Sequence, residues 1–288
     1  MLKGSIVALI TPFNDDNSIN FEKLAELIEF QISHGSAAIS ILGTTGEAPT
    51  ISFEEKKAIV EFVVKQVAGR VHINVGAGSN NTAQAVEFAQ AFEKLGADSL
   101  LVITPYYNKT NETGMLKHFT KIAESVDIPI IMYNAPGRTG VNLSVEAVEV
   151  LAKHPNITGL KEASGDIAYV EKISRYLSNN FALYSGNDDM IVPCLSLGAS
   201  GVISVWANFM PDVVKELIET FATNPAHSLS LQQKYLNLID SLFIEANPIP
   251  VKFVMNQLGY NVGSVRLPLD EPSERAKIQL LKEVEILQ

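Results

Sequence analysis

Short apolar runs alternate with amphipathic segments along most of the chain. The runs are rich in Ile, Val and Leu, and eight of them occupy residues 5–10, 37–42, 71–75, 99–103, 129–133, 157–161, 182–185 and 201–205. Strands that are apolar along their whole length are typical of parallel sheets covered on both faces. A strand and a helix repeated eight times therefore predict an α/β chain folded as a (β/α)8, or TIM, barrel.

The segments between the runs have the period of helices. In residues 21–32 the apolar side chains fall on one helical face and the charged ones on the other. Helical patterns continue after the eighth run, with an interruption at Asn-Pro-Ile-Pro, residues 247–250. We therefore predict a catalytic barrel at residues 1–226 and a C-terminal helical extension at residues 227–288, packed on the barrel or on a neighbouring subunit.

Composition narrows the classes of function. Of the 288 residues, 47% are hydrophobic and 19% are charged, as in soluble globular proteins. The formal net charge of -10 argues against nucleic acid as a partner, because phosphate binding needs clustered Lys and Arg. No apolar stretch reaches the roughly 18 residues of a membrane span, and the N-terminus lacks a secretory pattern, so we expect no membrane partner and a cytoplasmic location.

Neither the histidines nor the cysteine indicate a metal site. The five histidines show no i, i+4 pair and no Cys partner, and we expect each at a surface or a helix end: His34, His72, His118, His154 and His227. Asp188 and Asp189 are adjacent, which is more typical of a helix start than of a cation site. Cys194 lies in an apolar run and is expected to be a small buried hydrophobe. We predict no metal ion.

Polar residues follow the strands, at the end of the barrel where such folds keep their chemistry. Lys161 ends the sixth apolar run and Tyr133 ends the fifth. An ammonium group among apolar neighbours loses hydration, which favours the neutral amine, a nucleophile that can form a Schiff base with a carbonyl substrate. Tyr133 would move the protons that this chemistry requires. The alternative is an ion pair of Lys161 with Glu162 or with a carboxylate across the fold.

Three further groups accompany this pair. In the loop Gly-Thr-Thr-Gly-Glu, residues 43–47, Thr44 and Thr45 provide a cradle for a small carboxylate, although an ordinary glycine turn fits the pattern equally well. Arg138 lies in a Gly-Arg-Thr-Gly turn, which favours a clamp on a second carboxylate over a plain loop cation. Tyr107 extends a hydroxyl relay from Tyr133, or is an interface or core aromatic.

Together these stretches resemble the dihydrodipicolinate synthase family of pyruvate-dependent Schiff-base barrels. The resemblance covers nearly the whole chain, and Tyr-Asn-x-Pro-Gly-Arg-Thr-Gly at residues 133–140 is its more specific part. It implies condensation of pyruvate with L-aspartate 4-semialdehyde, on the route to lysine and diaminopimelate, without a dissociable cofactor. It also implies a homotetramer in which the homodimer is the minimal competent unit.

The same resemblance implies a role for each residue of the site. Lys161 forms the imine with pyruvate, and Tyr133 relays protons together with Thr44 and with Tyr107 from a neighbouring subunit. The implied substrate-binding residues are Thr45, Ile203, Gly186 and Arg138. Of these, Thr45 and Ile203 contact pyruvate, and Arg138 holds the carboxylate of the semialdehyde.

Three positions differ from the members of the family that lysine inhibits. Many of those carry two histidines and a glutamate at the places of Phe53, Lys56 and Gln84, whereas Asn80 and Tyr106 match. A cation at residue 56 and the loss of a carboxylate at residue 84 both disfavour a dicationic ligand such as lysine. We expect weak or absent inhibition by lysine.

Two other interpretations are open. A sibling aldolase would act on a 2-keto-3-deoxy acid or a sialic acid with the same Lys161 and Tyr133, and Arg138 argues against it. A non-catalytic barrel that serves as a scaffold or binding protein is the alternative of another class, because a fold alone does not guarantee activity.

Overall fold

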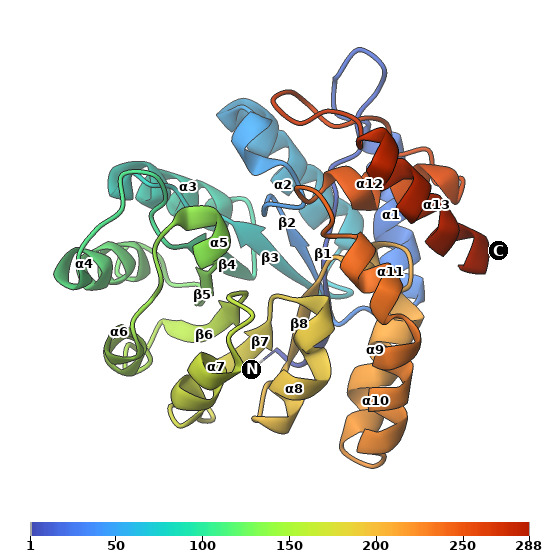
Figure 1. Ribbon diagram of the computed structural model, residues 1–288. Helices are drawn as coiled ribbons and strands as arrows, with labels where there is room; N and C mark the ends of the chain where they lie inside the picture. Colours follow the sequence, from blue (N-terminus) through green and yellow to red (C-terminus); the bar gives the residue numbers. More distant parts are fainter. Residues whose placement is uncertain (1, 288) are drawn as a thin grey trace.

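The computed structural model describes residues 2–287, in which the eight predicted strands close into one barrel (Figure 1). The strands run parallel and in chain order, and β8 pairs with β1 to complete the ring. They are β1 (Gly4–Ala8), β2 (Ala38–Ile41), β3 (His72–Gly76), β4 (Ser99–Ile103), β5 (Ile130–Asn134), β6 (Ile157–Glu162), β7 (Ala182–Ser185) and β8 (Gly201–Ser204). The predicted (β/α)8 barrel is confirmed.

Helices follow the strands and surround the barrel. Those between strands are α1 (Phe21–Ser33), α2 (Phe53–Val67), α3 (Thr82–Lys94), α4 (Glu112–Ala123), α5 (Pro136–Thr139), α6 (Val145–Leu151), α7 (Ile167–Ser174) and α8 (Ile191–Ser196). Those after β8 are α9 (Pro211–Phe221), α10 (Pro225–Lys234), α11 (Leu236–Ser241), α12 (Ile249–Gln257) and α13 (Glu274–Leu287). Short 3-10 turns are η1 (Ala48–Thr50), η2 (Asp188–Met190) and η3 (Trp206–Asn208). None of the helices within residues 2–287 is long and apolar enough to cross a membrane.

Polar residues fix where several helices begin. The side chain of Asn20 accepts a hydrogen bond from the Lys23 N–H at the start of α1. Ser52 and Glu55 form a reciprocal capping box at the start of α2. Asp166 accepts from two backbone N–H groups in the first turn of α7. Each cap satisfies donors that a helix start would otherwise leave without partners.

Apolar side chains form two separate cores. The larger one lies between the strands and the helices. The smaller one fills the barrel interior and includes Ile131, Tyr133, Tyr184 and Ile203. Because side chains alternate across a strand, Ile131 and Tyr133 of β5 share the inward face. The interior is therefore packed, and it carries a tyrosine at the carboxyl end of β5.

The helices after β8 lie against the barrel of the same chain. Helix α9 packs against β1, and α12 packs against η3, while α11 and α12 each contact α13 (Figure 1). Helix α10 begins at Pro225, so the division of the chain at residue 226 falls in its first turn. That division stays a prediction.

Candidate active site

Tyr133 and Lys161 lie side by side at the carboxyl ends of β5 and β6. They are register partners in this parallel pair, and Lys161 Nζ lies 4.4 Å from the centroid of the Tyr133 ring. The register shifts between Ile130 and Ile131, where β6 contains one extra residue. Such a bulge changes which side chains face each other across the remainder of the pair. Here it places the amine opposite the phenol.

Lys161 is buried without a countercharge at hydrogen-bonding distance. Its relative exposure is 5%, and within residues 2–287 no carboxylate forms an ion pair with it. Glu162 accepts instead from Asn134 Nδ2, at 2.7 Å, and from the Ser164 N–H. Burial raises the pKa of Glu162. The ion pair of Lys161 with Glu162 is therefore not formed.

Gly186 allows the loop after β7 to approach this lysine. A Cβ at residue 186 would lie 2.7 Å from Ala163 Cβ and 3.1 Å from Lys161 Cε. Any side chain there would displace the Lys161 side chain or its neighbours. Ile203, in β8, has a fully buried side chain in the interior core, and it is not among the residues that line the cavities described below.

A cavity of about 110 Å³ opens at Lys161. It is also lined by Tyr133, Thr45, Arg138, Gly186 and Asn247. The structure thus gathers the predicted amine, phenol and arginine and one of the two threonines of the cradle around one small space. Such a pocket, with convergent polar groups on apolar walls, is typical of a small-molecule site.

Asn247 joins two of these residues, and the sequence pattern did not single it out. Its Nδ2 donates to Thr45 Oγ1 at 2.9 Å, and its backbone oxygen accepts from Arg138 Nη2 at 3.3 Å. Its Oδ1 is buried without a hydrogen-bond partner among the described residues. The only signal in the sequence was the break in helical pattern at Asn-Pro-Ile-Pro.

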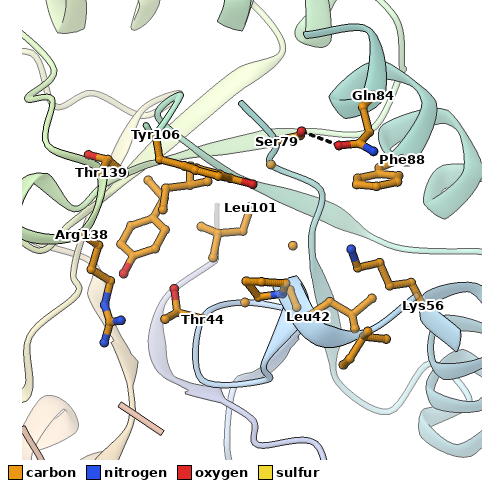
Figure 2. Close-up of a pocket in the computed structure, with 18 of the residues that line it drawn as sticks. Leu42, Thr44, Lys56, Ser79, Gln84, Phe88, Leu101, Tyr106, Arg138 and Thr139 are labelled. Carbon is orange, nitrogen blue, oxygen red and sulfur yellow. Dashed lines mark hydrogen bonds between the residues drawn. The ribbon is translucent and has the colours of Figure 1, made fainter. Parts of the chain in front are cut away.

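A larger cavity, of about 590 Å³, adjoins the first, because Tyr133 and Arg138 line both. Figure 2 shows Arg138 at one end and Lys56 at the other, with Thr44 and Tyr106 on opposite sides of the space near the Arg138 end. Lys56 Nζ lies 4.7 Å from the centroid of the Phe88 ring, and burial lowers its pKa. Gln84 accepts from Ser79 Oγ at 2.7 Å. This cavity therefore carries a partly desolvated cation at the end remote from Arg138.

Tyr107 does not enter the site of its own chain. It is 89% exposed, and neither cavity is lined by it. Its backbone φ is +66°, in the left-handed region that bulky residues rarely adopt. The adjacent Asn108 holds the loop by donating from Nδ2 to the Asn80 oxygen at 3.0 Å. The structure therefore presents this ring outward.

Asp188 and Asp189 begin the 3-10 turn η2, as expected of a helix start, whereas one expectation about a histidine needs correction. The carboxylate of Asp188 is buried and accepts from the N–H groups of Val205 and Trp206, each at 3.0 Å. Burial raises its pKa, which these bonds and the more distant Lys161 only partly offset. His118 is buried in α4, not at a surface or helix end, and burial lowers its pKa to about 4. Its Nδ1 contacts Thr82 Oγ1 at 2.9 Å.

Cys194 is buried, as predicted. Within residues 2–287, no three His, Cys, Asp or Glu side chains are grouped so that they could hold a metal ion.

A closed barrel whose carboxyl end carries a buried lysine beside a tyrosine has the architecture of an aldolase-type lyase. A model of the dihydrodipicolinate synthetase family matches residues 1–287, and the chain belongs to this family. The resemblance found in the sequence is confirmed.

Relatives and solved structures agree over nearly the full length. The 4-hydroxy-tetrahydrodipicolinate synthase of Thermoanaerobacter sp. (strain X514) is 50% identical over 286 residues, 99% of this chain and 96% of that protein. The crystal structure of dihydrodipicolinate synthase from Aquifex aeolicus matches with a TM-score of 0.96 at 41% identity, over 99% of this chain and 98% of that one. The crystal structure of the enzyme from Cyanidioschyzon merolae with lysine bound matches with a TM-score of 0.96 at 39% identity. The match covers 99% of this chain and 97% of that one.

Proposed function

We propose that this chain is a 4-hydroxy-tetrahydrodipicolinate synthase, which condenses pyruvate with L-aspartate 4-semialdehyde through an imine at Lys161. The observation that carries the proposal is the buried Lys161 beside Tyr133 in a cavity that Arg138 also lines. Family membership supports it. The reaction is a step of lysine and diaminopimelate biosynthesis, and we place the enzyme in the cytoplasm.

The chemistry proceeds from the amine. Lys161 Nζ attacks the keto carbon of pyruvate, water leaves, and loss of a methyl proton gives an enamine. The enamine carbon attacks the aldehyde carbon of the second substrate. The amino group of that substrate then attacks the imine carbon, closes the ring and releases Lys161. Tyr133 moves the protons, with Thr44 as the next hydroxyl of the relay. No dissociable cofactor takes part.

Two groups of donors hold the substrate carboxylates. Thr45 Oγ1 accepts from Asn247 Nδ2, which leaves the hydroxyl proton of Thr45 to donate to the carboxylate of pyruvate. Arg138 uses one nitrogen on the Asn247 oxygen, and its remaining N–H groups are available to the carboxylate of the semialdehyde. Gly186 completes the pyruvate side, and the pyruvate contact expected of Ile203 stays a prediction.

Tyr107 connects the proposal to a second copy of the chain. Its outward ring and its left-handed backbone fit a side chain that enters the site of a neighbouring subunit and joins Tyr133 and Thr44 in the relay. A strained backbone conformation persists where surrounding contacts hold it in place. We propose a homodimer as the minimal active unit and a homotetramer as the complete assembly.

The test is intact-protein and peptide mass spectrometry after pyruvate and borohydride. Stoichiometric pyruvate followed by borohydride is expected to leave a reduced adduct on the peptide that contains Lys161. Semialdehyde added before the borohydride is expected to discharge the adduct. An adduct that survives the semialdehyde identifies a sibling aldolase, and the absence of any adduct identifies a barrel without Schiff-base chemistry.

Replacing Arg138 with glutamine is expected to raise the KM for the semialdehyde by roughly 10- to 100-fold, as the loss of a charge-assisted pair does. The pyruvate adduct trapped by borohydride should stay at the native level, because Lys161 and Thr45 remain. Arg175→Gln, at an exposed arginine after α7, is the matched control. A loss of trapping equal to the loss of turnover would show that Arg138 serves the first substrate instead.

Lysine at millimolar concentration is expected to leave the initial rate nearly unchanged. The cation of Lys56 lines the larger cavity, and like charges repel strongly where water is partly excluded. The double variant Lys56→His and Gln84→Glu should bind lysine at least about tenfold more tightly, since one pair of repelling charges is removed and one attracting pair is added. Initial-rate titration and calorimetry measure both proteins, and micromolar inhibition of the native enzyme would contradict the expectation.

A further inference from the structure

A buried ion pair joins the C-terminal helices to the catalytic end of the barrel. Lys252 Nζ, in α12, lies 2.6 Å from Oε1 of Glu47, in the loop after β2, and the two side chains are 2% and 0% exposed. Lys252 Nζ also donates to the Ser264 oxygen at 2.8 Å and lies 4.2 Å from the centroid of the Phe13 ring. Burial lowers the pKa of Lys252 to about 8, against the pull of the Glu47 charge.

The second oxygen of Glu47 is held as well. Its Oε2 accepts from the Arg266 N–H at 2.8 Å. The guanidinium of Arg266 lies 4.3 Å from the Phe13 ring centroid and pairs with Glu55 at 2.6 Å. Two cations therefore stack on one aromatic ring, and both engage acidic residues at or near the loop after β2.

The backbone of Glu47 has a strained conformation that surrounding contacts must hold in place. Its φ is +56°, in the left-handed region, and its N–H donates to the Thr44 oxygen at 3.0 Å. A residue with a Cβ adopts this conformation at a cost, and it persists where the surroundings fix it. The side-chain contacts with Lys252 and Arg266 supply that fixation, and the turn they hold contains Thr44 and Thr45.

The same C-terminal segment touches the loop at a second point. Asn247 donates to Thr45 Oγ1, five residues before Lys252 meets Glu47. On the barrel side, Thr11 Oγ1 donates to the Gly46 oxygen at 2.7 Å. The loop at residues 43–47 is thus held between the β1 loop and the segment that runs from Asn247 to Arg266.

The buried ion pair between Glu47 and Lys252 is not well explained by folding stability alone. Desolvation offsets much of the attraction in a buried ion pair, and apolar residues of similar volume often serve folding equally well. We propose that Glu47 and Lys252 are positioning residues for the reaction, which set the loop so that Thr45 holds the carboxylate of pyruvate beside Lys161 and Thr44 keeps its place in the proton relay. This inference rests on the proposed function.

The test removes the charges of Glu47 and Lys252 and nearly keeps the volumes of their side chains. In the double variant Glu47→Gln and Lys252→Met, the KM for pyruvate is expected to rise at least about tenfold, because the carboxylate donors lose their fixed position. The kcat should fall less than kcat/KM, and saturating pyruvate should still give the borohydride-trapped adduct, because Lys161 is intact. Melting temperature and circular dichroism establish that the variant is folded.

A surface pair provides the matched control. Glu29 and Arg70 pair at 2.6 Å with both side chains more than 40% exposed, and Arg70 precedes β3, at the opposite end of the barrel. Glu29→Gln with Arg70→Met should leave the KM for pyruvate unchanged. The milder variant Phe13→Leu removes the ring beneath Lys252 and Arg266, and should raise the same KM about threefold, as the loss of an aromatic contact to a cation does.

A folded double variant with a native KM would overturn the inference. If the double variant does not fold, a native KM in Phe13→Leu overturns it. Neither result would contradict the proposed function, because that function is tested by the trapping and discharge of the pyruvate adduct in the native enzyme. A raised KM in both variants, with an unchanged control, supports the positioning role.

Discussion

Replacing Lys161 with methionine is expected to abolish both condensation and the borohydride-trapped pyruvate adduct. No other group in the small cavity offers a primary amine, so the variant cannot form the imine at all. Loss of a covalent nucleophile is expected to lower kcat/KM at least about 10⁴-fold. Methionine fills the space over the Tyr133 ring and beside Gly186, so the fold should be kept.

The control for this variant is Lys172→Met. Lys172 lies in α7, the helix that follows β6, and it is exposed. Its replacement should leave turnover and trapping at native levels. Unchanged turnover in Lys161→Met, measured with a coupled assay on the purified protein, would reject the imine mechanism.

Replacing Tyr133 with phenylalanine should lower kcat by roughly 10²- to 10⁴-fold, the range that a positioned acid-base group contributes. The ring that packs against Lys161 and fills the barrel interior is retained, and only the hydroxyl is lost. Trapping with pyruvate should still reach completion, although more slowly, because imine formation also requires proton transfer.

Tyr184→Phe tests whether that loss is specific to Tyr133. Tyr184 is also a tyrosine of the barrel interior and is the register partner of Lys161 in β7, but its hydroxyl donates to the Leu2 oxygen at 2.8 Å. Its removal costs about 1 kcal/mol of stability and should leave kcat near the native value. Equal losses of kcat in the two variants would show that the effect is not specific to the Tyr133 hydroxyl, and would contradict its role in proton transfer.

The fold was predictable because its signal is local. Each strand appears in the sequence as an apolar run, and the candidate site residues lie at the carboxyl ends of the strands or in the loops after them. The placement of Tyr133 opposite Lys161 was less accessible, since it depends on the bulge between β5 and β6. A bulge leaves little trace in the periodicity of a strand that is apolar on both faces.

Other features were missed because their partners are distant along the chain. Asn247 bonds to Thr45 across 202 residues, and Lys252 meets Glu47 across a similar separation. In the sequence Lys252 stands in a helical segment and Asn247 at the Asn-Pro-Ile-Pro break, and neither position indicates its distant partner. His118 was misassigned for a related reason, because α4 buries it against the hydroxyl of Thr82 in α3.

The contacts of Asn247, Lys252 and Arg266 also bear on how the enzyme is made. Synthesis runs from the N-terminus, so Lys161 leaves the ribosome well before the segment that braces the loop at residues 43–47. Chains begin to fold during synthesis, N-terminal parts first. A nascent barrel would therefore contain Lys161 before the loop at residues 43–47 has its contacts with the C-terminal segment. Catalysis would then begin only after the segment from Asn247 to Arg266 has been released, and chains that stop before this segment would stay inactive.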